Sequence, residues 1–264
     1  MPELPEVERA RALIEDRALG RRIAAVDDSD AYVCRPHAAG EIADALTGRE
    51  LVAVHRRGKT MWVETSGDGP VLGLHLGMAG RIVVDDAGAG DPEPARVEGD
   101  GDLPRRWDRF TIAFADGGRL VLRDRRRLGR ARLEPDVGRL GPDAAEVSRT
   151  VFRARVGRGD APVKARIMDQ AVIAGVGNLL ADEALWRARI DPRRPAGGLS
   201  ADELDRLRRE IRAANRSALR KGGVHTGTVI PARVRGGRCP RCGTEMERTT
   251  IGGRTTFWCP AEQR

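Results

Sequence analysis

Apolar and polar residues alternate through most of the first half of the chain, which is the pattern of half-buried β-strands. A helix from Glu6 to about Leu19 is expected ahead of these strands. Asp116-Gly117-Gly118 is a hairpin signal inside one of the alternating segments. The expected strand segments, separated by Gly-bearing turns, are residues 51–65, 71–84, 109–124 and 129–135. The first half therefore predicts an antiparallel β domain with a leading helix.

The pattern becomes helical from about residue 142 to residue 222. One helix is predicted to begin at a capping box of Ser200 and Glu203 and to end at Gly222-Gly223. Upstream, residues 163–186 indicate a helix, tight glycine turns and a second helix. We therefore expect an α+β multidomain protein, with domains at 1–135, 142–222 and 223–264.

Composition narrows the class of protein. The 264 residues carry a net charge of +8, which favours an anionic partner, most often nucleic acid. Arginine supplies nearly all of the positive charge, and this weakens the argument because it is also typical of a GC-rich genome. No apolar run approaches the ~20 residues of a membrane span. Four cysteines without a secretory leader indicate a reducing cytoplasm. The acidic, Gly- and Pro-rich residues 85–106 are expected to form a flexible loop.

A zinc site is predicted near the C-terminus. Cys239 and Cys242 form a C-x2-C turn, and sixteen residues separate Cys242 from Cys259. Such turns direct thiolates at one tetrahedral ion. Glu262 stands where a fourth cysteine would complete the pattern, so Zn²⁺ bound by three cysteines and Glu262 is our prediction. His225 or a water as fourth ligand, and a metal-free hairpin, remain alternatives. Cys34 is expected to be a buried or unrelated thiol.

The N-terminal sequence MPELPEVE allows two interpretations. Proline and acidic residues suit the first turn of a helix. Removal of the initiator methionine would also expose the secondary amine of Pro2, and an α-amino group has a pKa of about 8. A useful fraction of this amine is then an uncharged nucleophile, and Glu3 beside it could transfer protons.

Five motifs occur in the order seen in the formamidopyrimidine-DNA glycosylase and endonuclease VIII family. They are MPELPEVE, HLGMAG (75–80), DRRRLG (124–129), residues 163–186 and the terminal cysteine hairpin. The similarity spans nearly the whole chain, and the N-terminal motif resembles the formamidopyrimidine branch. The resemblance implies a β-sandwich, a helix–two-turn–helix domain and a zinc-ribbon-like hairpin.

The resemblance also implies a reaction. Pro2 should attack C1′ of a damaged nucleotide, and Glu3 should act as acid and base around the sugar. The base leaves, a Schiff base forms, and β- and δ-elimination cut the strand. Lys59 should assist proton transfer or hold the lesion phosphate, and Arg254 should grip phosphates at the flipped nucleotide. The enzyme must extrude that nucleotide because a duplex buries C1′.

DNA-binding residues follow from the same resemblance. Met78 and Leu128 should fill the vacated base stack, and Arg126 should contact the orphaned base. Leu128 replaces an aromatic wedge and stacks less well. Phosphate contacts are expected from the basic and helix-terminal residues Arg158, Lys164 and Asn178, with Asn178 also a candidate helix cap. Glu183 and Trp186 on the same helix are expected to pack.

The chain departs from the family pattern at three places. Glu262 replaces a zinc cysteine. The segment between Gly223 and Cys239 is short, which puts efficient 8-oxoguanine excision in doubt and favours ring-opened purines, oxidised pyrimidines and abasic sites. The family's DNA-contacting strand histidine has no clear counterpart near Trp107 and Arg109.

Three functions therefore compete. The favoured one is a bifunctional base-excision enzyme that acts as a monomer on damaged double-stranded DNA in the cytoplasm, associated with the nucleoid. The second is a paralogue that binds lesions or bent DNA without catalysis. The third, an unrelated zinc-ribbon regulator, does not account for the N-terminal motif.

Overall fold

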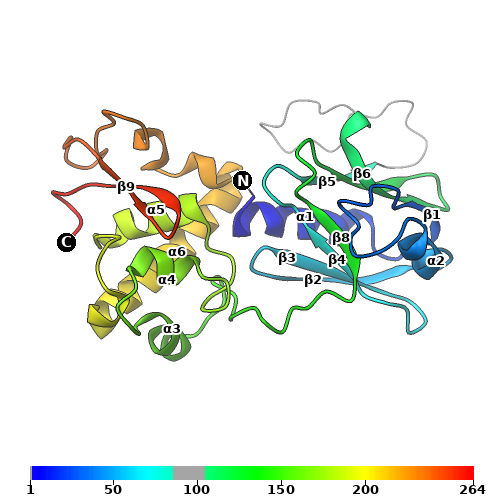
Figure 1. Ribbon diagram of the computed structural model, residues 1–264, viewed down its shortest axis with the longest axis horizontal. Coiled ribbons are helices and arrows are strands. Elements are labelled where there is room, and N and C mark those ends of the chain that lie inside the picture. The colour runs from blue at the N-terminus through cyan, green and yellow to red at the C-terminus, as the bar shows by residue number, and fades with distance from the viewer. Residues whose placement is uncertain (1, 86–104) are drawn as a thin grey trace. The chain divides into compact units, whose positions relative to one another are not determined.

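The computed structural model describes residues 2–85 and 105–264, so most of the expected acidic loop lies outside the described residues. The chain forms two compact units (Figure 1). One comprises Pro2 with Val7–Val137, and the other comprises Glu3–Glu6 with Gly138–Arg264. The tetrapeptide Glu3–Glu6 thus belongs to the second unit, although the sequence pattern suggested one N-terminal domain.

The N-terminal unit contains two four-stranded antiparallel sheets, which confirms the predicted β architecture. Helix α1 (Leu4–Arg17) precedes the strands, and α2 (Glu41–Leu46) follows the first of them. One sheet has the order β1 (Ile23–Asp27), β6 (Asp108–Phe114), β7 (Arg119–Arg123), β5 (Arg81–Asp85). The other has the order β2 (Leu51–Arg57), β3 (Thr60–Thr65), β4 (Leu72–His75), β8 (Arg130–Leu133).

Buried residues of both sheets and of α1 form one hydrophobic core, including Ile14, Met61 and Phe110. The apolar segment 71–84 is divided between the two sheets, because a turn at Leu76–Gly80 separates β4 from β5. Gly77 occupies the left-handed region at φ +59°, which favours glycine. This turn presents Met78 on the surface.

The C-terminal unit is helical and ends in a hairpin (Figure 1). Its helices are α3 (Arg149–Val156), α4 (Val163–Met168), α5 (Asn178–Ala188) and α6 (Ala201–Lys221). The Ser200 and Glu203 capping box starts α6, and Gly222 ends it at φ +97°, as predicted. Short 3-10 turns (η2, η3 and η4) lie at Ala196–Gly198, Val224–Thr226 and Ile230–Ala232. A further 3-10 turn, η1 (Arg105–Trp107), precedes β6 in the other unit.

The terminal hairpin pairs β9 (Glu247–Ile251) with β10 (Arg254–Trp258). Gly252 and Gly253 connect the strands, and both have positive φ, as a two-residue type I′ turn requires. Arg254 therefore follows directly after the turn. None of the described helices is long and apolar enough to cross a membrane.

Candidate functional site

The carboxylate of Glu3 is fully buried at the N-terminus of α5. It accepts hydrogen bonds from the backbone N–H groups of Gly177 (3.1 Å), Leu179 (2.9 Å) and Leu180 (3.0 Å). The first amides of a helix lack intrahelical partners and carry partial positive charge, so they stabilise an anion. These bonds anchor Glu3, the residue that directly follows Pro2, to α5.

The glycines of AGVGN allow this close approach. A Cβ on Gly177 would lie 2.2 Å from the Glu3 carboxyl carbon, and one on Gly175 would lie 2.4 Å from Leu4 Cδ1. Gly175 also has φ +114°. The sequence predicted a tight turn at AGVGN, and the structure shows that Glu3 and Leu4 pack directly against it.

Glu6 strengthens the same anchor. Its carboxylate accepts hydrogen bonds from the Glu3 N–H (2.9 Å) and from the Val224 N–H (2.7 Å). The peptide that joins Pro2 to Glu3 is therefore held through its nitrogen as well as through the Glu3 side chain. Glu6 is a site candidate that the sequence interpretation passed over, although the motif contained it.

Lys164 is completely buried, which disagrees with the expected direct contact to a DNA phosphate. Its ammonium pairs with Asp182 (2.7 Å) and donates to Asn178 Oδ1 (2.7 Å) and Thr256 Oγ1 (2.8 Å). An ammonium group can only donate, so its partner on Asn178 must be the amide oxygen. The Asn178 NH2 group is thereby oriented away from Lys164.

Asn178 lies at the N-terminus of α5, as expected, but it is the first residue inside the helix and the N-cap is Gly177, so the prediction of Asn178 as the cap was wrong. The sequence interpretation also offered the neighbouring amides as phosphate ligands. Glu3 already accepts the N–H groups of Leu179 and Leu180, so these amides are not available to a phosphate, and the Asn178 side chain is left as the candidate contact. The physical reason is that an N-terminal carboxylate neutralises the helix terminus from within the protein.

Arg254 is exposed at the turn of the terminal hairpin. The turn contacts α4, because a Cβ on Gly252 would lie 3.4 Å from Ala165 Cβ. Buried Lys164 joins the same strand through Thr255 and Thr256. Arg254, Lys164, Asn178 and Glu3 are thus brought into one region of the C-terminal unit. Arg158 is exposed after the end of α3.

Lys59 lies in the turn of the β2–β3 hairpin, after Gly58 at φ +61°. His75 ends β4 opposite Thr60, and burial lowers its pKa, with further lowering by the positive charges of Lys59, Arg130 and Arg132. A neutral imidazole fits its contact, in which Nδ1 accepts the Gly77 N–H at 3.0 Å. His75 belongs to the HLGMAG motif, and the sequence pattern did not predict a site role for it.

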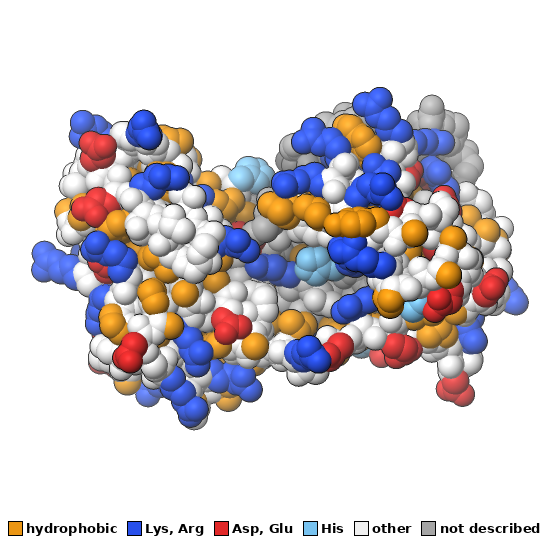
Figure 2. Space-filling view, viewed as in Figure 1, with side chains coloured by type: hydrophobic (Ala, Val, Ile, Leu, Met, Phe, Trp, Pro, Cys, Tyr) orange, Lys and Arg blue, Asp and Glu red, His pale blue; other side chains and the backbone are white. Residues whose placement is uncertain are grey.

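Met78 and Leu128 come from loops that touch. A Cβ on Gly77 would lie 2.4 Å from the backbone carbon and oxygen of Leu128, so only a glycine permits this spacing. The Met78 side chain is 41% exposed. Arg126 is exposed and Leu128 is half-buried on the adjoining loop. Basic side chains are spread over the viewed face of the N-terminal unit (Figure 2).

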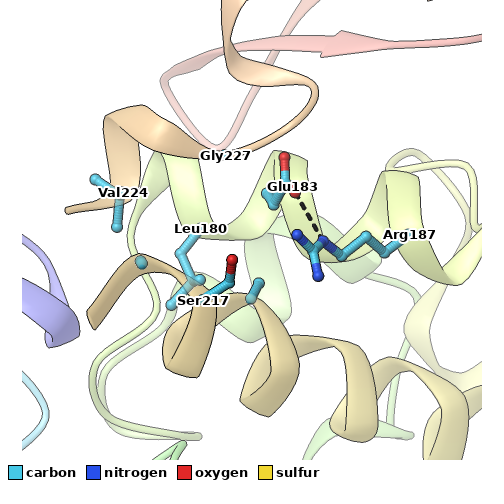
Figure 3. Close-up of a pocket in the computed structure, with 8 residues that line it drawn as sticks. Leu180, Glu183, Arg187, Ser217, Val224 and Gly227 are labelled. Carbon is cyan, nitrogen blue, oxygen red and sulfur yellow. Dashed lines mark hydrogen bonds and ion pairs between the residues drawn. The ribbon is translucent and has the colours of Figure 1, made fainter. Parts of the chain in front are cut away.

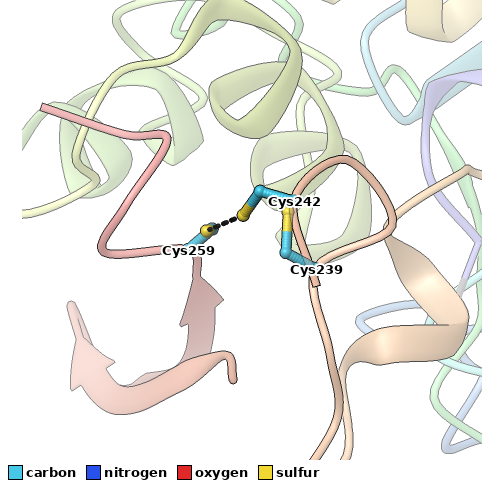
Figure 4. A group of neighbouring side chains, drawn as sticks. All are labelled: Cys239, Cys242 and Cys259. Carbon is cyan, nitrogen blue, oxygen red and sulfur yellow. Dashed lines mark hydrogen bonds between the residues drawn. The ribbon is translucent and has the colours of Figure 1, made fainter. Parts of the chain in front are cut away.

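The thiols of Cys239, Cys242 and Cys259 converge, with their sulfur atoms within 4.8 Å of one another (Figure 4). Such a cluster fits a thiolate-bound zinc ion. Burial opposes ionisation of Cys239, but the Trp186 indole N–H (3.3 Å) and backbone N–H groups lower the pKa of this thiol to about 7. Burial and the Cys242 thiol raise the pKa of Cys259 to about 11. The chain therefore has a structural zinc site built on three cysteines.

Glu262 lies outside this three-sulfur cluster. Its carboxylate pairs with Arg241 at 3.1 Å and with Arg189 at 3.7 Å. Cys34 is fully buried, and burial together with nearby aspartates raises its pKa to about 12, as suits an inert thiol.

A small pocket lies between α5 and α6, and its charged lining residue Glu183 has partners within the fold (Figure 3). Glu183 at its edge accepts from Arg187 Nε (2.7 Å) and from the Val229 N–H (2.9 Å). This carboxylate fastens the segment after η3 to α5. Glu183 and Trp186 are both buried, in agreement with the packing role expected for them.

The chain thus combines three structural parts. The N-terminal unit is a β domain that exposes Met78 and Arg126, and the C-terminal unit contains both the helical domain that binds Glu3 and the zinc hairpin. Three family models match these parts in order. They are the formamidopyrimidine-DNA glycosylase N-terminal domain (residues 1–131), its H2TH domain (140–229) and a zinc finger found in FPG and IleRS (236–261). The chain belongs to the formamidopyrimidine-DNA glycosylase family.

Relatives and solved structures agree with this membership. The formamidopyrimidine-DNA glycosylase of Roseiflexus sp. (strain RS-1) is 38% identical, and all of both chains is covered. That of Nocardioides sp. (strain ATCC BAA-499 / JS614) is 35% identical, with 100% of this chain and 94% of the relative covered. The Lactococcus lactis Fpg in complex with abasic-site DNA matches over all of both chains with TM-score 0.80 and 26% identity. MutM in complex with DNA containing carbocyclic 8-oxo-G matches over all of both chains with TM-score 0.80 and 27% identity.

Proposed function

We propose that this chain is a base-excision-repair DNA glycosylase and abasic-site lyase that uses Pro2 as its nucleophile. The class of activity follows from the family. The observation that carries the assignment to Pro2 is the buried Glu3 carboxylate on α5, because it fixes the residue next to the proposed nucleophile. Fixing a nucleophile before substrate arrives lowers the entropic cost of attack.

The proposed reaction begins when the Pro2 nitrogen donates its lone pair to C1′ of the damaged nucleotide. The glycosidic bond breaks, and its electron pair leaves with the base, which takes up a proton. Opening of the sugar ring gives an iminium ion between Pro2 and C1′. Loss of the C2′ proton expels the 3′ phosphate, and a second elimination expels the 5′ phosphate.

Glu3 is proposed to move protons around the sugar during these steps. Its carboxylate begins as an anion held by three N–H groups, which suits the role of proton acceptor. Lys59 is proposed to assist proton transfer or to hold the lesion phosphate. Its neighbour His75 is kept neutral by burial and by the Lys59 charge, both of which lower the His75 pKa.

DNA contacts are proposed on each unit separately. On the N-terminal unit, Met78 and Leu128 enter the vacated stack and Arg126 contacts the unpaired base. On the C-terminal unit, Asn178, Arg158 and Arg254 bind phosphates. Lys164 acts as a positioning residue, because it orients the Asn178 amide from inside the protein.

The short segment between Gly223 and Cys239 is the basis for the proposed substrates. We favour ring-opened purines, oxidised pyrimidines and abasic sites over 8-oxoguanine. The protein is proposed to act as a monomer on damaged duplex DNA in the cytoplasm, at the nucleoid.

A panel of duplexes tests the function, each with one ring-opened purine, oxidised pyrimidine, abasic site or 8-oxoguanine. We expect base release and strand cleavage for the first three, with slower release of 8-oxoguanine. Undamaged duplex is the control. Tight binding of damaged duplexes without base release or cleavage, by protein that mass spectrometry shows to lack Met1, would support the non-catalytic paralogue instead.

Zinc is proposed to be held by Cys239, Cys242, Cys259 and Glu262, with Glu262 released from Arg241 when the metal binds. When bound, zinc would tie the cysteine turns together and so support the hairpin that carries Arg254. A carboxylate in place of a thiolate makes the site less selective for zinc than a four-cysteine site.

Glu262→Cys should therefore strengthen zinc binding, because it completes the second C-x2-C turn, which begins at Cys259. We expect a roughly tenfold or greater fall in zinc dissociation constant, measured by chelator competition. Cobalt substitution provides a second readout, since its absorption bands report the number of sulfur ligands. Glu262→Gln is the matched control and should weaken binding. Equal affinity in all three proteins would exclude Glu262 as a ligand and leave His225 or water for the fourth position.

A further inference from the structure

The loop between β7 and β8 carries charged side chains that face solvent. Its three arginines, Arg125 to Arg127, are exposed and Leu128 is only half-buried. We call residues 125–128 the arginine loop. A loop without a core of its own needs backbone partners to keep a single conformation.

Asp124 supplies those partners. Its side chain is completely buried at the end of β7. One carboxylate oxygen accepts the Arg126 N–H at 2.9 Å, and the other accepts the N–H groups of Leu128 and Gly129, both at 2.7 Å. Two amides of the arginine loop and the amide of the next residue, Gly129, thus donate to one carboxylate, which fixes the backbone of the loop.

Two further contacts fix the direction in which the arginine loop projects. Arg127 adopts the left-handed region at φ +55° and pairs with Asp30 through two hydrogen bonds of 2.9 and 2.7 Å. The Leu128 backbone lies against Gly77, next to exposed Met78. The loop is therefore built as a preformed support for two residues, Arg126 and Leu128, that make few contacts within the fold.

We propose that Asp124 is a positioning residue that holds Arg126 and Leu128 in the geometry needed to enter the base stack. This inference rests on the proposed function and assigns a role to a completely buried residue. Unstacking a base pair costs a few kcal/mol, and a loop that is already ordered does not have to lose further conformational freedom as it enters the duplex.

Asparagine cannot replace Asp124 in this role. The carboxylate accepts on both oxygens, whereas an amide offers one oxygen and an NH2 group that cannot accept. In either amide orientation, at least one loop N–H faces a donor instead of an acceptor. Asp124→Asn changes neither Pro2 nor Glu3, so the amine chemistry should survive.

The test uses abasic-site duplex with 2-aminopurine opposite the lesion, so that unstacking of the orphaned base raises fluorescence. At saturating protein, the wild type should give the rise and Asp124→Asn should lose most of it. Excision from lesion duplexes should fall roughly tenfold to 100-fold, as expected for misplaced groups. Borohydride trapping on a single-stranded abasic oligonucleotide should stay at the wild-type level.

Asp108→Asn is the matched control. Asp108 pairs with Arg123 in the same sheet, so its substitution removes a half-buried charge without removing the acceptor of the loop amides, which is Asp124. It should lower the melting temperature but leave the fluorescence rise intact. A full rise and wild-type excision in Asp124→Asn would overturn the proposal. Absence of trapping in the wild type would instead defeat the proposed function.

Hydrogen exchange of the wild-type protein gives an independent test if Asp124→Asn does not fold. The Leu128 and Gly129 amides should exchange much more slowly than the Arg125 amide, because their acceptor is buried. Equal exchange at these positions in the free protein would show that Asp124 does not fix the loop.

Discussion

Replacing Pro2 with glycine is expected to abolish the borohydride-trapped adduct between this protein and abasic-site DNA. Proline forms an iminium ion with no N–H proton to lose, so the positive charge that draws electrons from C1′ persists. A glycine amine forms an iminium ion that still carries an N–H proton, and loss of this proton gives a neutral imine. The glycine variant also loses the ring that restricts the backbone before Glu3. The measurement is the yield of protein cross-linked to labelled duplex after reduction.

Pro5→Ala is the matched control for this experiment. Pro5 lies in the first turn of α1 and is buried, but it has no terminal amine. Its replacement should leave the adduct intact. Mass spectrometry must show that Met1 is absent from each protein, because a retained residue blocks the amine. If Pro2→Gly gave the wild-type yield of trapped adduct, Pro2 would not be the nucleophile. Lys59 would then be the next amine to test.

Replacing Glu3 with glutamine is expected to reduce base excision and stability together. Loss of a proton-transferring group should lower the excision rate at saturation roughly 100-fold. The amide also leaves at least one α5 N–H without an acceptor, which costs about 1–3 kcal/mol. That cost corresponds to a fall in melting temperature of about 3 to 10 °C for a chain of this size.

Asp28→Asn separates the two effects of the Glu3 substitution. Asp28 is buried like Glu3 and accepts backbone N–H groups from Gly40, Ile42 and Ala43 at the start of α2. Its substitution should lower the melting temperature by a similar amount without changing the excision rate at saturation. If Glu3→Gln keeps the wild-type excision rate but melts lower, Glu3 is an anchor for the N-terminus and transfers no proton.

Several parts of the fold could be predicted because their signals are local. The Ser200 capping box, the Gly222 terminus and the Asp116-Gly117-Gly118 turn are each set by residues a few positions apart. The cysteine spacing likewise indicated a shared site, which the three sulfur atoms form. In these cases the structure depends on a short stretch of backbone. The Ser200 side chain bonds an amide three residues away, and the cysteine thiolates bind one ion.

Other parts depended on contacts between distant residues, which residue types and spacing do not reveal. Lys164 has the charge expected of a phosphate ligand, yet Asp182 and Asn178 enclose it. The amides at the start of α5 look available for phosphate in the sequence, but Glu3 reaches them from 174 or more positions away. His75 lies near Lys59 because strand pairing places it opposite Thr60, and this proximity could not be predicted from the sequence.

The sequence by itself determined the antiparallel strands, the capped helices, the cysteine cluster and the N-terminal residues with candidate chemistry. Only the tertiary structure decided which charged groups face inward, what the AGVGN turn receives and how the Met78 and Leu128 loops meet. The reason is physical. Backbone periodicity and turn preference act over a few residues, whereas burial of Glu3, Asp124 and Lys164 becomes favourable only when distant amides and charges converge to compensate the loss of hydration.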